Sequence, residues 1–216
     1  MLGRVDTQRA YERIREQIVS LELAPGTLIS EQELAEQLSL GLTPVREALQ
    51  WLAHDDLVVV SPRHGLYVAD VNLSDLKQIS ELRTVLEALS ARLAAQRATQ
   101  DDLDVLDVLR QESSQASSAD ARYLLELDHR FHRAVALAAH NKYLEHVLEH
   151  FFALSQRLWY LVLPELDFLA NALEKHLKLV DAIRIGDAEN AEQIMRDHVH
   201  NFYARVHRAI EQKRLD

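Results

Sequence analysis

The sequence of 216 residues contains no cysteine, which excludes disulfide bonds, zinc-thiolate sites and thiol catalysis. Only five glycines and four prolines interrupt the chain, so long helices are expected to dominate. No run of about 18 apolar residues occurs, and the first residues are too charged for a signal peptide. These absences predict a soluble, cytoplasmic protein that makes no contact with a membrane.

Positive charge is scarce as well. The formal net charge is −10, and residues 1–70 hold six arginines and no lysine against eleven aspartates and glutamates. Because non-specific nucleic-acid binding depends on neutralising phosphates, this balance argues against a general nucleic-acid coat protein. It leaves open a site-specific binder with a local contact surface. The hydrophobic content of 48% is enough to form a core in one or two domains.

Three helices and a hairpin are expected in the first 70 residues. Ser30, with Glu33 three residues later, forms a capping box at the start of the second helix. Thr43 is a good N-cap for the third helix, and Pro44 is a good first helical residue. The expected helices are residues 7–23, 30–38 and 43–54, and the expected strands are residues 57–60 and 66–70.

This layout is typical of a winged helix-turn-helix, whose third helix enters the major groove of DNA while the hairpin tip touches the backbone or minor groove. The alternative is an ordinary three-helix domain with a surface arginine, and the layout alone does not decide between them. The candidate DNA-binding residues are Thr43, Pro44 and Arg46 on the third helix and Arg63, His64 and Gly65 at the hairpin tip.

From Ser74 onward the sequence predicts helices almost throughout. Thr99 is expected to cap a helix, residues 113–120 form the clearest loop, and further breaks fall near Asn141, Pro164 and Gly186. The predicted fold is therefore mainly α: a winged helix-turn-helix over residues 1–71, then an all-α bundle of about six helices over residues 72–216.

The stretch DHRFH at residues 128–132 places polar side chains on an apolar helical face. Leu124, Phe131 and Val135 recur at the spacing of a buried stripe, and Asp128 and His132 fall within it. Because buried polar groups are costly unless something satisfies them, this pair requires a partner.

Two further histidines have inward positions by helical spacing, His176 and His198, whereas His146 and His150 lie off their apolar stripe. An aspartate and three histidines from three helices suit a divalent ion such as Zn²⁺ or Ni²⁺, with positions left for water or a ligand oxygen. The alternative is that each inward histidine is a neutral core residue with a hydrogen bond.

Residues 25–58, PGTLISEQELAEQLSLGLTPVREALQWLAHDDLV, and the following GLYV resemble the DNA-binding domain of GntR-family bacterial transcription regulators. The resemblance covers roughly residues 8–70. Family members commonly carry serine and then arginine before the TPVREAL core, whereas this chain has Gly41 and Leu42. One DNA contact implied by the family is therefore missing here.

The remainder resembles the FCD effector-binding domain of the FadR branch of that family, in ELRTVLEALSARLAA, DHRFHRAVALAAHNKYL and EKHLKLVDAIRIGDAENAEQIMRDHV. The six-helix length is most similar to the VanR-type variant. The resemblance implies that Asp128, His132, His176 and His198 are metal ligands and that the effector is a small carboxylate. It makes Arg83 a candidate to hold that carboxylate, with an ion pair to Glu87 as the alternative. Asn141 is a weaker candidate, because an asparagine after a helix is often a C-terminal cap.

Together these patterns predict a homodimeric transcription regulator that binds a pseudo-palindromic double-stranded DNA operator and responds to a small organic acid at a metal-containing domain. One rival is a helical metalloenzyme that uses a His₃Asp ion to activate water. Another is a structural DNA-binding protein whose histidines only fill the core.

Overall fold

The computed structural model describes residues 2–116, 120–161 and 169–213. The chain forms two compact units: the first contains the chain up to Leu73 together with Ala153–Tyr160, and the second contains Ser74–Phe152 together with the chain from Leu161 onward. The domain boundary after residue 71 stays a prediction. The sequence did not predict that residues 153–160 group with the first unit.

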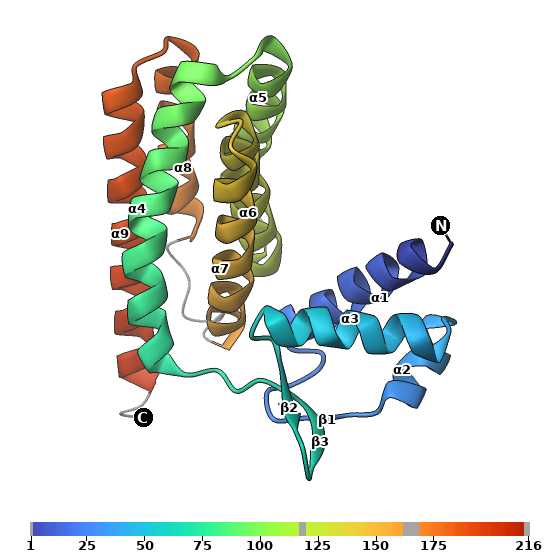
Figure 1. Cartoon of the computed structure of the whole chain (residues 1–216). Coiled ribbons are helices and arrows are strands. Elements are labelled where there is room, and N and C mark those ends of the chain that lie inside the picture. Colours follow the sequence, from blue (N-terminus) through green and yellow to red (C-terminus); the bar gives the residue numbers. More distant parts are fainter. Residues whose placement is uncertain (1, 117–119, 162–168, 214–216) are drawn as a thin grey trace. The chain divides into compact units, whose positions relative to one another are not determined.

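The first unit has the helices and hairpin of a winged helix-turn-helix, as predicted. The three strands form an antiparallel sheet in the order β1-β3-β2, with Val58 opposite Val68 and Ser61 opposite Gly65. Figure 1 shows the β2–β3 hairpin projecting away from α3. β1 was not predicted from the sequence. The elements are α1 (Leu2–Val19), β1 (Leu28–Ile29), α2 (Glu31–Leu38), α3 (Leu42–His54), β2 (Val58–Ser61) and β3 (Gly65–Val68).

The start of α3 differs from the prediction. Gly41, with an extended backbone, is the N-cap and makes no side-chain capping bond, so Leu42 is the first helical residue. Thr43 and Pro44 are therefore the second and third residues of the helix, not its cap and first residue. Pro44 fits there because the first-turn amides have no partner within the helix. At α2 the Ser30 side chain accepts a hydrogen bond from the Glu33 amide at 3.2 Å, which is one of the two hydrogen bonds of the predicted capping box.

Six described helices follow from Leu73 onward and form the bundle of the second unit, except for residues 153–160, which group with the first unit. Their number agrees with the prediction, and the fold is mainly α. Thr99 and Asp102 form a capping box at the start of α5, which runs three residues into the predicted loop at 113–120. The predicted break at Pro164 lies outside the described residues. The elements are α4 (Leu73–Arg97), α5 (Gln100–Gln115), α6 (Ala121–Ala138), α7 (Lys142–Leu161), α8 (Leu169–Arg184) and α9 (Ala188–Lys213).

The helices of this bundle lie side by side (Figure 1), and α8 packs against α5, α6 and α9. Residues of α6 and α8 that the sequence places on apolar stripes, such as Phe131, Val135 and Val180, are fully buried. This packing brings the inward faces of α6, α8 and α9 together. None of the described helices is both long and apolar enough to cross a membrane.

Candidate metal centre and DNA-binding surface

Four side chains that are far apart in the sequence meet inside the second unit. Asp128 and His132 come from α6, His176 from α8 and His198 from α9. All four are buried, and each offers one ligand atom within 4.8 Å of the others. The structure thus brings together every residue of the predicted ligand set.

The local structure of α6 explains why Asp128 and His132 both face the interior of the bundle. The Asp120 side chain caps the helix by accepting from the Arg122 and Tyr123 amides, and the apolar stripe then turns one face inward. Asp128 and His132 lie four residues apart, so they share that face. Phe131 stacks on the ring of His176 with centroids 3.8 Å apart and planes 6° apart, which fixes the orientation of this imidazole.

The distances among the four groups match a shared ion. From Asp128 Oδ1, the Nε2 atoms of His176, His132 and His198 lie at 3.3, 3.6 and 3.8 Å. The Nε2 atoms of His132 and His198 are 3.1 Å apart. Ligand atoms about 2.1 Å from one ion, at tetrahedral or octahedral angles, are about 3.0–3.4 Å from each other. These four separations lie close to that range, and the remaining pairs of ligand atoms lie within 4.8 Å of each other.

Several atoms of the cluster lack the hydrogen bonds that burial demands, and two of them lie opposite each other. Asp128 Oδ1 and His176 Nε2 are buried and have no hydrogen-bond partner, although they face each other. A buried carboxylate oxygen without a partner is costly, and a cation between these atoms would satisfy both. The donor set of three imidazoles and one carboxylate fits Zn²⁺ or Ni²⁺.

Glu87 of α4 supports this cluster from outside. Its carboxylate contacts His132 Nδ1 on one side, while Arg83 Nε donates to Glu87 Oε1 at 2.6 Å on the other. Arg83 Nη1 also donates to the Tyr203 hydroxyl at 2.9 Å. A carboxylate on the far nitrogen of a metal-binding histidine orients the ring and increases its basicity. Sequence reasoning missed this role of Glu87, although the Arg83–Glu87 spacing of four residues was a signal.

The three histidines of the cluster differ in the direction in which their surroundings shift the pKa. Burial alone would lower the pKa of His132, but the carboxylates of Glu87 and Asp128 raise that pKa to about 9. Burial lowers the pKa of His176 to about 3 and also lowers the pKa of His198. Although burial opposes it, contact with the three imidazoles holds the pKa of Asp128 well below its usual value. In the absence of metal, His132 therefore holds a proton at neutral pH, while the other two imidazoles are neutral.

A small cavity of about 20 Å³ adjoins the cluster. His132 is the one member of the cluster that lines it, together with the outer carboxylate Glu87, and this volume holds about one water molecule. Its other lining residues are His129, Arg133, Ala136, Glu145, Leu148, Glu149 and Phe152.

The two candidate effector residues have other partners in this structure. Arg83 is buried and makes the Glu87 ion pair that was the alternative interpretation. The Asn141 side chain accepts from the Tyr143 and Leu144 amides, so it caps the start of α7 and is not a C-terminal cap. Binding of an effector by either residue stays a prediction.

The candidate DNA-binding side chains lie on exposed parts of the first unit. Arg46 on the first turns of α3 is exposed, and its Nε donates to Glu31 Oε2 at 2.6 Å. Arg63 and His64 lie at the exposed tip between β2 and β3. Gly65 has a positive φ of 97°, which disfavours any residue with a Cβ and explains a glycine at this turn.

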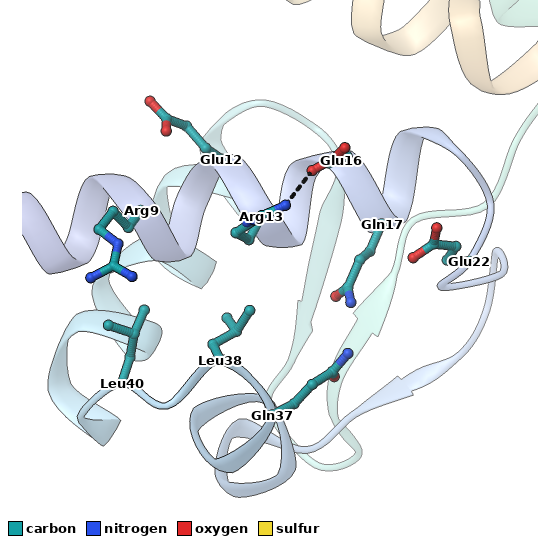
Figure 2. A pocket seen from close by; sticks show the side chains of 9 residues that line it. All are labelled: Arg9, Glu12, Arg13, Glu16, Gln17, Glu22, Gln37, Leu38 and Leu40. Atoms are coloured by element: carbon teal, nitrogen blue, oxygen red, sulfur yellow. Dashed lines mark hydrogen bonds and ion pairs between the residues drawn. The ribbon is translucent and has the colours of Figure 1, made fainter.

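The first unit also has a polar pocket of about 480 Å³ between α1 and α2 (Figure 2). Gln17 and Gln37 face each other across it, and Arg13 pairs with Glu16 at 3.3 Å. Acidic and basic side chains are mixed around this pocket, so its charges largely offset one another. Such a surface does not favour a phosphate backbone, and we assign the pocket no role in DNA binding.

A winged helix-turn-helix followed by a separate helical unit is the layout of a class of two-domain DNA-binding regulators. Residues 6–68 match the gntR family of bacterial regulatory proteins, and residues 78–201 match the FCD domain. The chain therefore belongs to the GntR family and carries an FCD domain, as the sequence predicted.

Relatives that align with most of this chain are also named as transcription regulators. The HTH-type transcriptional repressor RspR of Escherichia coli strain K12 is 28% identical over 97% of this chain and 92% of that protein. The HTH-type transcriptional regulator LutR of Bacillus subtilis strain 168 is 30% identical over 83% of this chain and 91% of that protein. The solved structure of E. coli McbR/YncC has a TM-score of 0.83 at 23% identity, covering 94% of this chain and 97% of that one, which shows the fold. The protein is a transcription regulator and not an enzyme, so the metalloenzyme alternative is wrong.

Proposed function

We propose that this regulator is a homodimer that binds a divalent ion, and that a small organic acid bound beside the ion controls its affinity for an operator. The observation that carries the proposal is the buried cluster of Asp128, His132, His176 and His198 with its outer carboxylate Glu87. Zn²⁺ or Ni²⁺ is the proposed ion, because imidazole and carboxylate ligands suit both. When bound, the ion would have coordination positions left open for a carboxylate oxygen.

The proposed partner of the first unit is a double-stranded, pseudo-palindromic operator. Arg46 and Thr43 would contact the major groove, and the hairpin tip would contact the DNA backbone or minor groove. A chain of this kind works where the bacterial chromosome is, which implies the cytoplasm. The proposed DNA-binding residues are Thr43, Pro44, Arg46, Arg63, His64 and Gly65.

Arg83 is the proposed guanidinium partner of the effector carboxylate. The Arg83 guanidinium donates to the Glu87 carboxylate and to the Tyr203 hydroxyl. An effector carboxylate would replace the hydrogen bond to Tyr203, because a bond to a hydroxyl is weaker than one to a carboxylate. Exchange of this contact would shift α4 against α9, because Arg83 and Tyr203 belong to these helices. Such repacking is the proposed origin of the change in operator affinity.

The test starts with elemental analysis of protein purified without a histidine tag, followed by chelation and a melting scan with added Zn²⁺ or Ni²⁺. Metal that binds the folded state is expected to raise the melting temperature in a concentration-dependent way. His132→Ala and His176→Ala should abolish this increment, whereas His146→Ala, an exposed histidine on α7, should keep it. Absence of both bound metal and any metal-dependent shift would contradict the proposal and leave the cluster as a hydrogen-bonded core.

A further inference from the structure

The charges buried around the cluster limit the effector that it can accept, and this inference rests on the proposed function. Three formally charged acidic and basic side chains lie there: Arg83 pairs with Glu87, and Glu87 and Asp128 each contact His132. All are buried, with 2–3% of their surface exposed. Buried charges are costly unless they are paired, so the sum of charges decides which ligand completes the site.

Arg83 and Glu87 cancel each other, since they form a direct ion pair. The histidines bind a metal as neutral imidazoles. Asp128 offsets one of the two positive charges of a divalent ion. One positive charge therefore remains inside the bundle, and one negative charge from a ligand neutralises it.

The walls of the adjoining cavity oppose a second negative charge. Glu145 and Glu149 line it together with one arginine, Arg133. Glu149 faces His129 at 3.2 Å, while no side-chain partner accompanies Glu145 among the described residues. A second carboxylate of a ligand would lie among these acidic groups at close range, where repulsion is strong.

Part of the cavity wall is apolar, since Ala136, Leu148 and Phe152 line it. The volume of about 20 Å³ holds about one water molecule, so a carbon chain can enter only if these side chains repack, and each added carbon requires more repacking. We propose that the effector is a short-chain monocarboxylate, which gives its one charge to the ion and its carbon chain to this apolar wall, and that Glu145 and Glu149 reject dicarboxylates.

The test compares butyrate with succinate, which have four carbons each and differ by one carboxylate, on the full-length protein loaded with Zn²⁺. Calorimetry is expected to give at least about tenfold tighter binding of butyrate than of succinate, from the repulsion of one nearby carboxylate. Glu145→Gln should reduce this preference by about tenfold. Glu126→Gln, an exposed glutamate on α6, is the matched control and should leave the preference unchanged. Metal content is measured before and after each titration.

The possible results distinguish a failure of the monocarboxylate inference from a failure of the proposed function. Equal or tighter binding of succinate, or a preference that Glu145→Gln does not change, would overturn the monocarboxylate inference while the proposed function stands. If the ion stays bound and neither acid binds, the effector part of the proposed function fails and the inference fails with it. If no ion binds, the metal part of the proposed function has failed.

Discussion

At the residue scale, Glu87 links the groups on which the proposed regulation depends. Its carboxylate contacts Arg83 of the same helix and His132 Nδ1 of α6. With a proton on Nδ1 directed at Glu87, the Nε2 lone pair of His132 is directed at the cluster, which is the tautomer that metal binding requires. Although burial opposes it, Arg83 and His132 lower the pKa of Glu87 to about 2, so this carboxylate stays charged.

Glu87→Gln should therefore weaken both metal binding and the fold. Loss of a carboxylate behind a metal-binding histidine is expected to lower metal affinity about 10–100-fold. The buried Arg83 guanidinium would lose its counter-ion, which should lower the free energy of unfolding by about 3–5 kcal/mol. Chelator competition and denaturant unfolding measure the two effects, with the exposed Glu81→Gln on α4 as control. Metal affinity equal to that of the control would remove Glu87 from the site.

The protonation of His132 predicts how metal affinity depends on pH. Its pKa is raised to about 9 from an unfolded value of about 6.5, so below pH 9 an ion must displace a proton. We expect the Zn²⁺ affinity to rise about tenfold per pH unit between pH 7 and 9 and to level off above that range. Competition with a chromophoric chelator in a metal buffer gives the affinity at each pH.

The same protonation has the opposite effect on the metal-free protein. A raised pKa stabilises the fold fully below the unfolded pKa, and this contribution is lost as the pH rises through about 9. Melting temperatures in the presence of chelator should thus fall between pH 7 and 9, while the increment caused by metal grows. A metal affinity that is constant over this range would show that His132 is not a ligand.

At the scale of the element, Asn141 at the start of α7 either caps the helix or binds the effector, and substitutions distinguish these two roles. Its side-chain oxygen accepts from two backbone amides of the first turn, which otherwise have no partner in the helix. Asn141→Ala is expected to lower the free energy of unfolding by about 1 kcal/mol, whereas Asn141→Asp keeps the cap. Denaturant unfolding measures this, and calorimetry with butyrate shows whether either variant changes ligand affinity. A loss of ligand affinity in both variants would support the effector role instead.

The third helix and the hairpin carry the prediction about DNA. Arg46→Ala should weaken operator binding by about 1–3 kcal/mol if the guanidinium reads a base edge, and Arg63→Ala should weaken binding to all sequences and reduce its salt dependence. Arg9→Ala, which removes an exposed arginine at the polar pocket of α1, is the control. Fluorescence anisotropy at matched salt compares the three. Wild-type affinity in both α3 and hairpin variants would mean that the DNA-binding surface lies elsewhere.

At the scale of the whole molecule, symmetry predicts the form of the operator. A two-fold dimer places two identical DNA-binding units on two half-sites, whose centres lie about 10 base pairs or a multiple of that apart. Light scattering should give twice the chain mass of 24.7 kDa, and genomic footprinting should give pseudo-palindromic sites. A monomer that protects single, asymmetric sites would contradict the dimer. The genes beside the footprint would also indicate which acid the protein senses.

The sequence by itself determined most of the elements and the four members of the cluster. Helical periodicity and capping residues act over a few neighbours, so they predict α4, the Thr99 cap and the inward positions of Asp128 and His132. Such local rules failed at the start of α3, because Gly41 with an extended backbone serves as the cap as well as Thr43 would. They also missed β1, since a two-residue strand exists only through its pairing with β3.

Only the tertiary structure decided what these residues face. Glu87 and Tyr203 are 116 residues apart in the chain, and the packing of α4 against α9 brings both to Arg83. The packing of α4 against α6 places Glu87 behind His132. The two amides that donate to Asn141 belong to the following helix, whereas the sequence left open whether Asn141 caps the preceding helix or the following one. Periodicity reports which face of a helix is buried. The charge balance of the site, the raised pKa of His132 and the size of the cavity depend on distances between helices, which no local pattern encodes.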